Sequence, residues 1–223
     1  MCYEARDRTR ITGNAFHHRD TEKNQNLKNA AFDFSVTLRS VVKNFRCLKP
    51  EHRGGRRKNE MAIRKSQDKL LREHVVYLLT GGGAHASFDD AVKGMPEKSH
   101  GVKPEGLPHS AWMLLEHLRL AQWDILEFSR NAKHKSPKWP EGYWPKVEAP
   151  AGTAAWEKSI QQFHDDLRAM KELVEKPKTD LYARLPWGDG QTVLREALLV
   201  ADHNAYHVAQ LIDVRRLLGA WKE

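Results

Sequence analysis

His203 and His207 stand four residues apart in the run DHNAYH near the end of the chain. On an α-helix this spacing places both imidazoles on one face, one turn apart, where they can bind a single metal ion. The residues that share this face are mostly apolar, so the pair is expected to point toward a core, where unpaired imidazoles are costly. The alternative is a pair of buried histidines that hydrogen bonds satisfy without a metal.

His117 extends this pattern to a second helix, because it lies in the run LLEHLRLAQWD, where apolar residues recur at helical spacing on its own face. Three inward-facing histidines on two long helices predict a metal site of three imidazoles. Asp124 lies two turns after His117 on nearly the same face, so its carboxylate could orient an imidazole or reach the metal through water. The alternative for Asp124 is an ordinary polar residue at the end of a helical bundle.

The elements that must position these residues are helical throughout the chain from Met61 onward, and no strand is predicted there. Ser110 and Thr153 are the expected N-caps of two of the helices. Long connections separate the helices, which permits crossovers between parallel helices. We therefore predict an all-α fold, a four-helix bundle with long crossover loops. The predicted helices cover residues 62–79, 84–94 (a short piece), 111–130, 154–175 and 192–218.

The first sixty residues differ in character from the rest. They carry 14 Lys+Arg against 7 Asp+Glu, whereas residues 61–223 carry 23 against 22. Helical periodicity is absent, and only residues 32–38 alternate like a short strand. We predict a basic, disordered extension over residues 1–60 and a bundle domain over 61–223, with Met61 as a candidate for the true start. A basic arm that contacts nucleic acid is the weaker interpretation of this segment.

Several classes of function are excluded by the sequence. The two cysteines, Cys2 and Cys47, support neither a disulfide framework nor a Cys-rich zinc site, and they leave the bundle without a thiol nucleophile. The run Gly81–Gly83 lacks the Lys-Ser/Thr of a phosphate-binding loop, and no Gly-x-Ser-x-Gly elbow occurs. Without a secretory signal or a membrane span, we expect a cytoplasmic protein with no membrane contact.

From about Lys69 to Trp221 the chain resembles the DinB-like superfamily of bacterial metal-binding four-helix bundles, which are not the DNA polymerases of the same name. The resemblance rests on HSAWMLLEHL ending just after His117, on DHNAYHVAQL around His203 and His207, and on the closing RRLLG. It implies a divalent metal on these three histidines. It also implies a bundle in which the second and third helices run parallel through a long crossover. Ala209 replaces a glycine common in the family, and residues 1–60 match nothing in it.

Three neutral imidazoles leave coordination positions open, as catalytic rather than structural zinc sites do. Similar proteins include thiol S-transferases, a maleylpyruvate isomerase and amidase-like hydrolases. The resemblance thus implies a metal-dependent transferase that uses a low-molecular-weight thiol, or a hydrolase, acting on a small-molecule substrate. Zinc or nickel suits neutral imidazole, and iron is a further option. The alternative is a non-catalytic bundle that metal stabilises or that senses metal.

His85 joins Asp124 as a candidate catalytic residue, because the break at Gly81–Gly83 could aim it at the open metal position. A hydrogen-bonded packing histidine is the alternative. Asp202 and Glu196 are further candidates for a general base. Three aromatic residues of the 131–152 connection form either a lid over a pocket or a cover on the outside of the bundle: Trp139, Tyr143 and Trp144.

The helix over 192–218 has a second apolar face, opposite the one that carries the two histidines. We expect a homodimer through this face, because a bundle helix normally needs only one apolar face. The alternative is cover by the first helix and the 131–152 connection within one chain. The residues of the second face are Leu194, Leu198, Ala201, Ala205, Val208 and Ile212.

Overall fold

The computed structural model of the protein describes residues 53–221. This range contains one isolated β-bridge, between Arg184 and Thr192, and no strand, so the predicted all-α class is confirmed. No helix in it is both long and apolar enough to cross a membrane. Its α-helices are α1 (Arg53–Thr80), α2 (Phe88–Val92), α3 (Ala111–Arg130), α4 (Thr153–Glu175) and α5 (Val193–Leu217), with short 3-10 turns at Glu97–Ser99 and Glu141–Tyr143.

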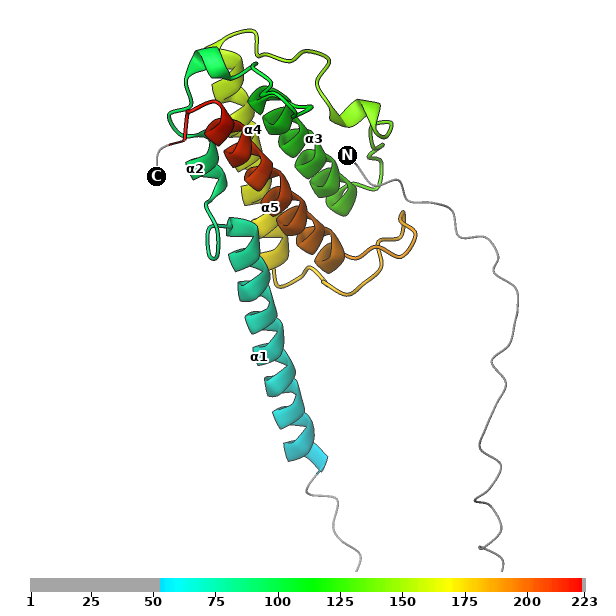
Figure 1. The fold of residues 1–223 in the computed structure, drawn as a ribbon. Helices are drawn as coiled ribbons and strands as arrows, with labels where there is room; N and C mark the ends of the chain where they lie inside the picture. The colour runs from blue at the N-terminus through cyan, green and yellow to red at the C-terminus, as the bar shows by residue number, and fades with distance from the viewer. Residues whose placement is uncertain (1–52, 222–223) are drawn as a thin grey trace, which may run out of the picture. The chain divides into compact units, whose positions relative to one another are not determined.

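The four long helices form the bundle. α3 packs against α4 and α5, and α1 packs against the same two helices, while the short α2 packs on α5. Figure 1 shows α3 and α4 running in the same direction, because the connection over residues 131–152 returns along the bundle before α4 begins. The expected bundle and its long crossover are therefore present.

The core between these helices positions the side chains that carry chemistry. Leu118 on α3, Phe163 on α4 and Val200 on α5 are at most 1% exposed, and burying each such side chain contributes about 1.5–3 kcal/mol. The buried amide of Gln122 donates to the Phe163 carbonyl at 2.7 Å and accepts from Asn204 Nδ2 at 2.8 Å. This pair of bonds links α3, α4 and α5 and holds them in one register.

Side-chain caps set the starts of the two helices that carry the three histidines. Ser110 accepts a hydrogen bond from the backbone N–H of Met113, as predicted, and Thr192 accepts one from that of Arg195. The prediction that Thr153 caps the next helix is wrong. Thr153 is the first residue of α4, and it follows Gly152, which offers no side-chain cap.

α1 begins at Arg53, nine residues before the predicted start at Ala62, so the predicted boundary at residue 61 falls inside this helix. Residues 56–67 are all exposed and have no apolar stripe to reveal a helix by periodicity. The missing apolar stripe is the reason the prediction began the helix too late, whereas the high helix propensity of Arg, Lys, Glu and Met is consistent with helix in this segment. Of the extension predicted to be disordered over residues 1–60, residues 53–60 are helical in α1, and residues 1–52 lie outside the described residues. The predicted strand over 32–38 and both cysteines also lie outside them.

The second apolar face of α5 is largely covered within the chain, because α1 and α2 pack against this helix. Val208 and Ile212 belong to the buried core, and Ala201 and Ala205 are partly buried. Leu198 remains 42% exposed at one end of the face. Cover by the first helix, one half of the alternative, is therefore present, but α2 and not the 131–152 connection supplies the rest, because that connection packs on α3. The homodimer itself stays a prediction.

Candidate metal centre

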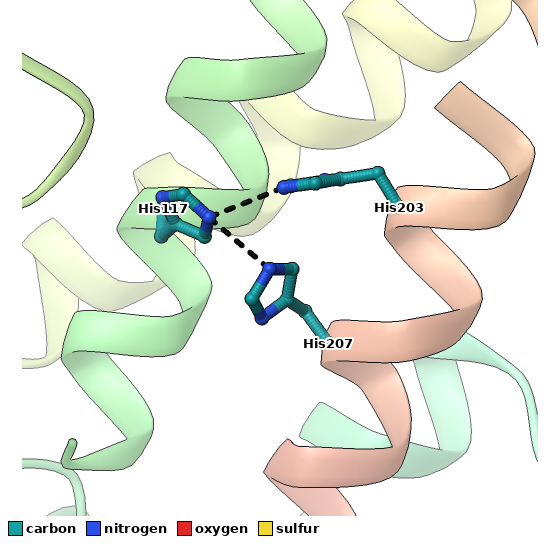
Figure 2. A group of neighbouring side chains, drawn as sticks. All are labelled: His117, His203 and His207. Atoms are coloured by element: carbon teal, nitrogen blue, oxygen red, sulfur yellow. Dashed lines mark hydrogen bonds between the residues drawn. The ribbon is translucent and has the colours of Figure 1, made fainter. Parts of the chain in front are cut away.

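The three predicted histidines converge at the contact between α3 and α5. The Nε2 atom of His117 lies 3.1 Å from Nε2 of His203 and 3.1 Å from Nε2 of His207 (Figure 2). One ligand atom from each residue lies within 4.8 Å of the other two. These atoms are close enough for small side-chain rotations to place all three about 2.0–2.1 Å from one ion. The group could therefore hold a metal ion.

The partners of the Nδ1 atoms determine where the imidazole protons are. His117 Nδ1 donates to the backbone carbonyl of Tyr143 at 2.9 Å, and His207 Nδ1 donates to Gln210 Oε1 at 2.7 Å. In a neutral imidazole the other nitrogen then carries a lone pair and no proton. The lone pairs of His117 Nε2 and His207 Nε2 thus face each other at 3.1 Å, which is unfavourable unless a cation lies between them. This donor set fits a divalent metal.

His203 is the third imidazole of the group, and its Nδ1 atom lacks the hydrogen bond that His117 and His207 make through theirs. Its Nδ1 is buried and has no hydrogen-bond partner within the usual limits, and the same is true of Oδ1 of the adjacent Asn204. The bond from Asn204 Nδ2 to Gln122 fixes the amide orientation, so that Oδ1 is the free atom. A polar atom left unpaired in a buried site costs free energy, and such sites often have a functional reason.

Burial keeps the three imidazoles uncharged at neutral pH. It lowers the pKa of His203 to about 3, with further lowering by the like charges of His207 and His117. Burial also lowers the pKa of His207 to about 4, and it lowers that of His117 against the opposing effect of the Tyr143 carbonyl. Neutral imidazole is the form that binds a metal ion.

Asp124 lies on the same helix as His117, but its carboxylate binds the 131–152 connection. Its two oxygens accept hydrogen bonds from His134 Nε2 and from the Tyr143 hydroxyl, both at 2.6 Å. Asp124 contacts none of the three imidazoles directly, and its link to His117 runs through Tyr143, whose backbone carbonyl accepts from His117 Nδ1. Asp124 is not a member of the group that could hold a metal.

His85 is exposed and lies on the other side of α5. It lines a pocket with Ala201, Ala205 and Val208, which lie on the face of α5 opposite His203 and His207. Its Nδ1 pairs with the carbonyl of the next residue. The structure therefore does not bring this candidate catalytic residue to the three histidines, because the loop after Gly83 leads into α2 and away from α3.

The aromatic residues of the 131–152 connection differ in how they contact the three histidines. Trp144 stacks on His117, with ring centroids 4.0 Å apart and planes 2° apart, and it also stacks with His109 at 4.0 Å. Trp139 is 65% exposed. Trp144 and the Tyr143 carbonyl were not identified as contacts of a ligand. Only the concentration of aromatic residues in a long connection pointed to them.

The family model of the DinB superfamily matches residues 83–211, more than half of the chain. The chain belongs to the DinB superfamily. No curated protein and no solved structure matches it.

Proposed function

We propose that this member of the DinB superfamily is a divalent-metal-dependent enzyme that acts on a small molecule. The reaction would be transfer to or from a low-molecular-weight thiol, with hydrolysis as the second option. The observation that carries the proposal is the convergence of three imidazoles, with no fourth protein ligand in the group found among residues 53–221. Structural zinc sites are closed by four protein ligands, whereas catalytic sites keep a position for water or substrate.

The side chains around the three histidines support a cation at this point. Bonds to the Tyr143 carbonyl and to Gln210 direct two bare Nε2 atoms inward, and burial keeps the rings neutral. A bound divalent ion supplies Lewis-acid chemistry there and lowers the pKa of a thiol or water that binds to it. We propose zinc or nickel, because both accept neutral imidazole, and iron as the third option.

The side chains available to activate a nucleophile favour a thiol cosubstrate over water. Residues 53–221 contain no cysteine, so the bundle itself supplies no thiol, and in this proposal the thiol enters as a cosubstrate. Three carboxylates were considered as bases. Asp124 accepts hydrogen bonds from His134 and Tyr143, Glu196 is buried and paired with Arg195, and Asp202 is exposed. A thiol starts from a pKa of about 8.5 and water from about 15.7, so a thiol needs less help from a base to become a nucleophile.

Metal analysis of the full chain, purified without a polyhistidine tag, is the first test. We expect about one divalent ion per chain in the wild type, and loss of the ion in His117→Gln. His74→Gln is the matched control, because His74 is an exposed histidine on α1. A wild-type protein that binds no zinc, nickel or iron under reducing conditions contradicts the proposal.

Activity is then measured on the metal-loaded protein with two panels. One panel pairs low-molecular-weight thiols with electrophiles, and the other contains small amides and esters. We expect turnover in the thiol panel that His117→Gln abolishes and His74→Gln retains. A loaded protein that is inactive in both panels supports the alternative, a non-catalytic metal-binding bundle.

A further inference from the structure

We propose that Tyr143 and Trp144, anchored by Asp124, are positioning residues that hold His117 in the tautomer and ring plane needed for metal binding. This inference rests on the proposed metal site. It assigns a role to the 131–152 connection, which otherwise only joins two parallel helices.

Tyr143 makes two contacts with α3, one at each end of the residue. Its backbone carbonyl accepts from His117 Nδ1 at 2.9 Å, and its hydroxyl donates to Asp124 Oδ2 at 2.6 Å. His117 and Asp124 are seven residues apart on α3, about 10.5 Å along the axis and on nearly the same face. One tyrosine therefore spans two turns of the helix that carries the ligand, which sets the position of the carbonyl along α3.

The carboxylate of Asp124, which binds the Tyr143 hydroxyl, is buried, and each of its oxygens accepts a hydrogen bond. Asp124 is 7% exposed, and its second oxygen accepts from His134 Nε2 at 2.6 Å. His134 lies at the start of the connection and Tyr143 in its middle, so one carboxylate binds two parts of it. Ser110 additionally donates to the Glu148 carbonyl near the end of the connection. Hydrogen bonds thus join the start, the middle and the end of the connection to α3 and its N-cap residue.

Trp144 sets the orientation of the His117 ring plane, whereas the Tyr143 carbonyl sets its tautomer. The indole lies parallel to the His117 imidazole, with planes 2° apart and centroids 4.0 Å apart. The Tyr143 carbonyl selects the tautomer with the proton on Nδ1, and the Trp144 ring restricts rotation of the imidazole. Together they present the Nε2 lone pair toward His203 and His207.

Tyr143→Phe in the full-length protein tests this role, because it removes only the hydroxyl that Asp124 holds. Tyr182→Phe is the matched control, since Tyr182 is 65% exposed and lies in a different loop. Nitrogen-15 NMR of the metal-free protein reports the His117 tautomer. We expect Nδ1 protonated in the wild type and in the control, and a mixture of both tautomers in Tyr143→Phe. Thermal unfolding of each metal-free protein verifies the fold.

Zinc affinity, measured by competition with a chelator, is the second readout. Loss of such a supporting contact weakens metal binding about 10-fold to 100-fold, and we expect a value near 10-fold for Tyr143→Phe. Trp144→Leu, which leaves the Tyr143 bonds in place, is expected to weaken binding by a similar factor while His117 keeps its tautomer.

An unchanged tautomer in Tyr143→Phe, with zinc affinity changed less than about threefold in both variants, overturns the inference. If the wild type binds no zinc, nickel or iron, the proposed function fails, and the tautomer populations alone decide whether these residues position His117. If Tyr143→Phe does not fold, the zinc affinity of Trp144→Leu decides the matter.

Discussion

Acid should destabilise the metal-free bundle through the three-histidine group. The folded protein holds His203 with a pKa of about 3, whereas an unfolded histidine titrates near 6.5. Below pH 6.5 the unfolded chain binds a proton at His203 that the folded chain does not. The free energy of unfolding therefore keeps its full value above this pH and falls as the pH drops toward 3. At pH 5, about 1.5 units below the pKa of the unfolded histidine, His203 alone lowers the free energy of unfolding by about 2 kcal/mol, at 1.36 kcal/mol per pKa unit.

Urea unfolding in the presence of a chelator, at pH 7 and at pH 5, measures this cost. His203→Gln removes the titrating ring, so the variant should lose about 2 kcal/mol less than the wild type between the two pH values. His74→Gln, on the exposed surface of α1, should behave like the wild type. If His203→Gln and the wild type lose the same free energy, the ring is not held neutral by burial and the description of the site is wrong.

Zinc at a hundredfold excess over its Kd should raise the free energy of unfolding by about 2.7 kcal/mol. Differential scanning calorimetry should show this as a Tm increase of about 5–10 °C, which His117→Gln abolishes. A chain that begins at Met61 should bind zinc and melt within a few degrees of the full chain, since residues 56–67 are all exposed; insolubility or a large fall in Tm contradicts this. We predict that light scattering at micromolar concentration gives the mass of two chains, and that Leu198→Arg, at the exposed end of the second face of α5, gives the mass of one. A single-chain mass for the wild type at every concentration refutes the dimer.

The histidines of the candidate site were predictable because their arrangement is mostly local. The spacing of His203 and His207 is a property of one helix, and the apolar residues around them and around His117 indicate which way each helix faces. The start of α3 at its Ser110 cap was predictable for the same reason, since a cap acts within one turn. The all-α class followed from periodicities of this kind.

Features that depend on segments far apart in the chain were not predictable from these patterns. The anchor of Asp124 lies 10 residues away at His134 and 19 residues away at Tyr143, in a connection with no regular periodicity. The start of α1 was missed because its exposed turns need no apolar stripe. The cover on the second face of α5 depends on where α1 and α2 pack.

The sequence by itself determined which residues lie on which helical face, because 3.6 residues per turn relates neighbours in the chain to neighbours in space. Only the tertiary structure decided that His117 on α3 lies 3.1 Å from both His203 and His207 on α5, and that a loop carbonyl accepts the Nδ1 proton of His117. It also decided that His85 lies elsewhere. These outcomes depend on helix packing and on the path of long connections, in which the contacting groups are separated by up to 90 residues. No local spacing encodes contacts at that separation, so they arise only when the whole core is assembled.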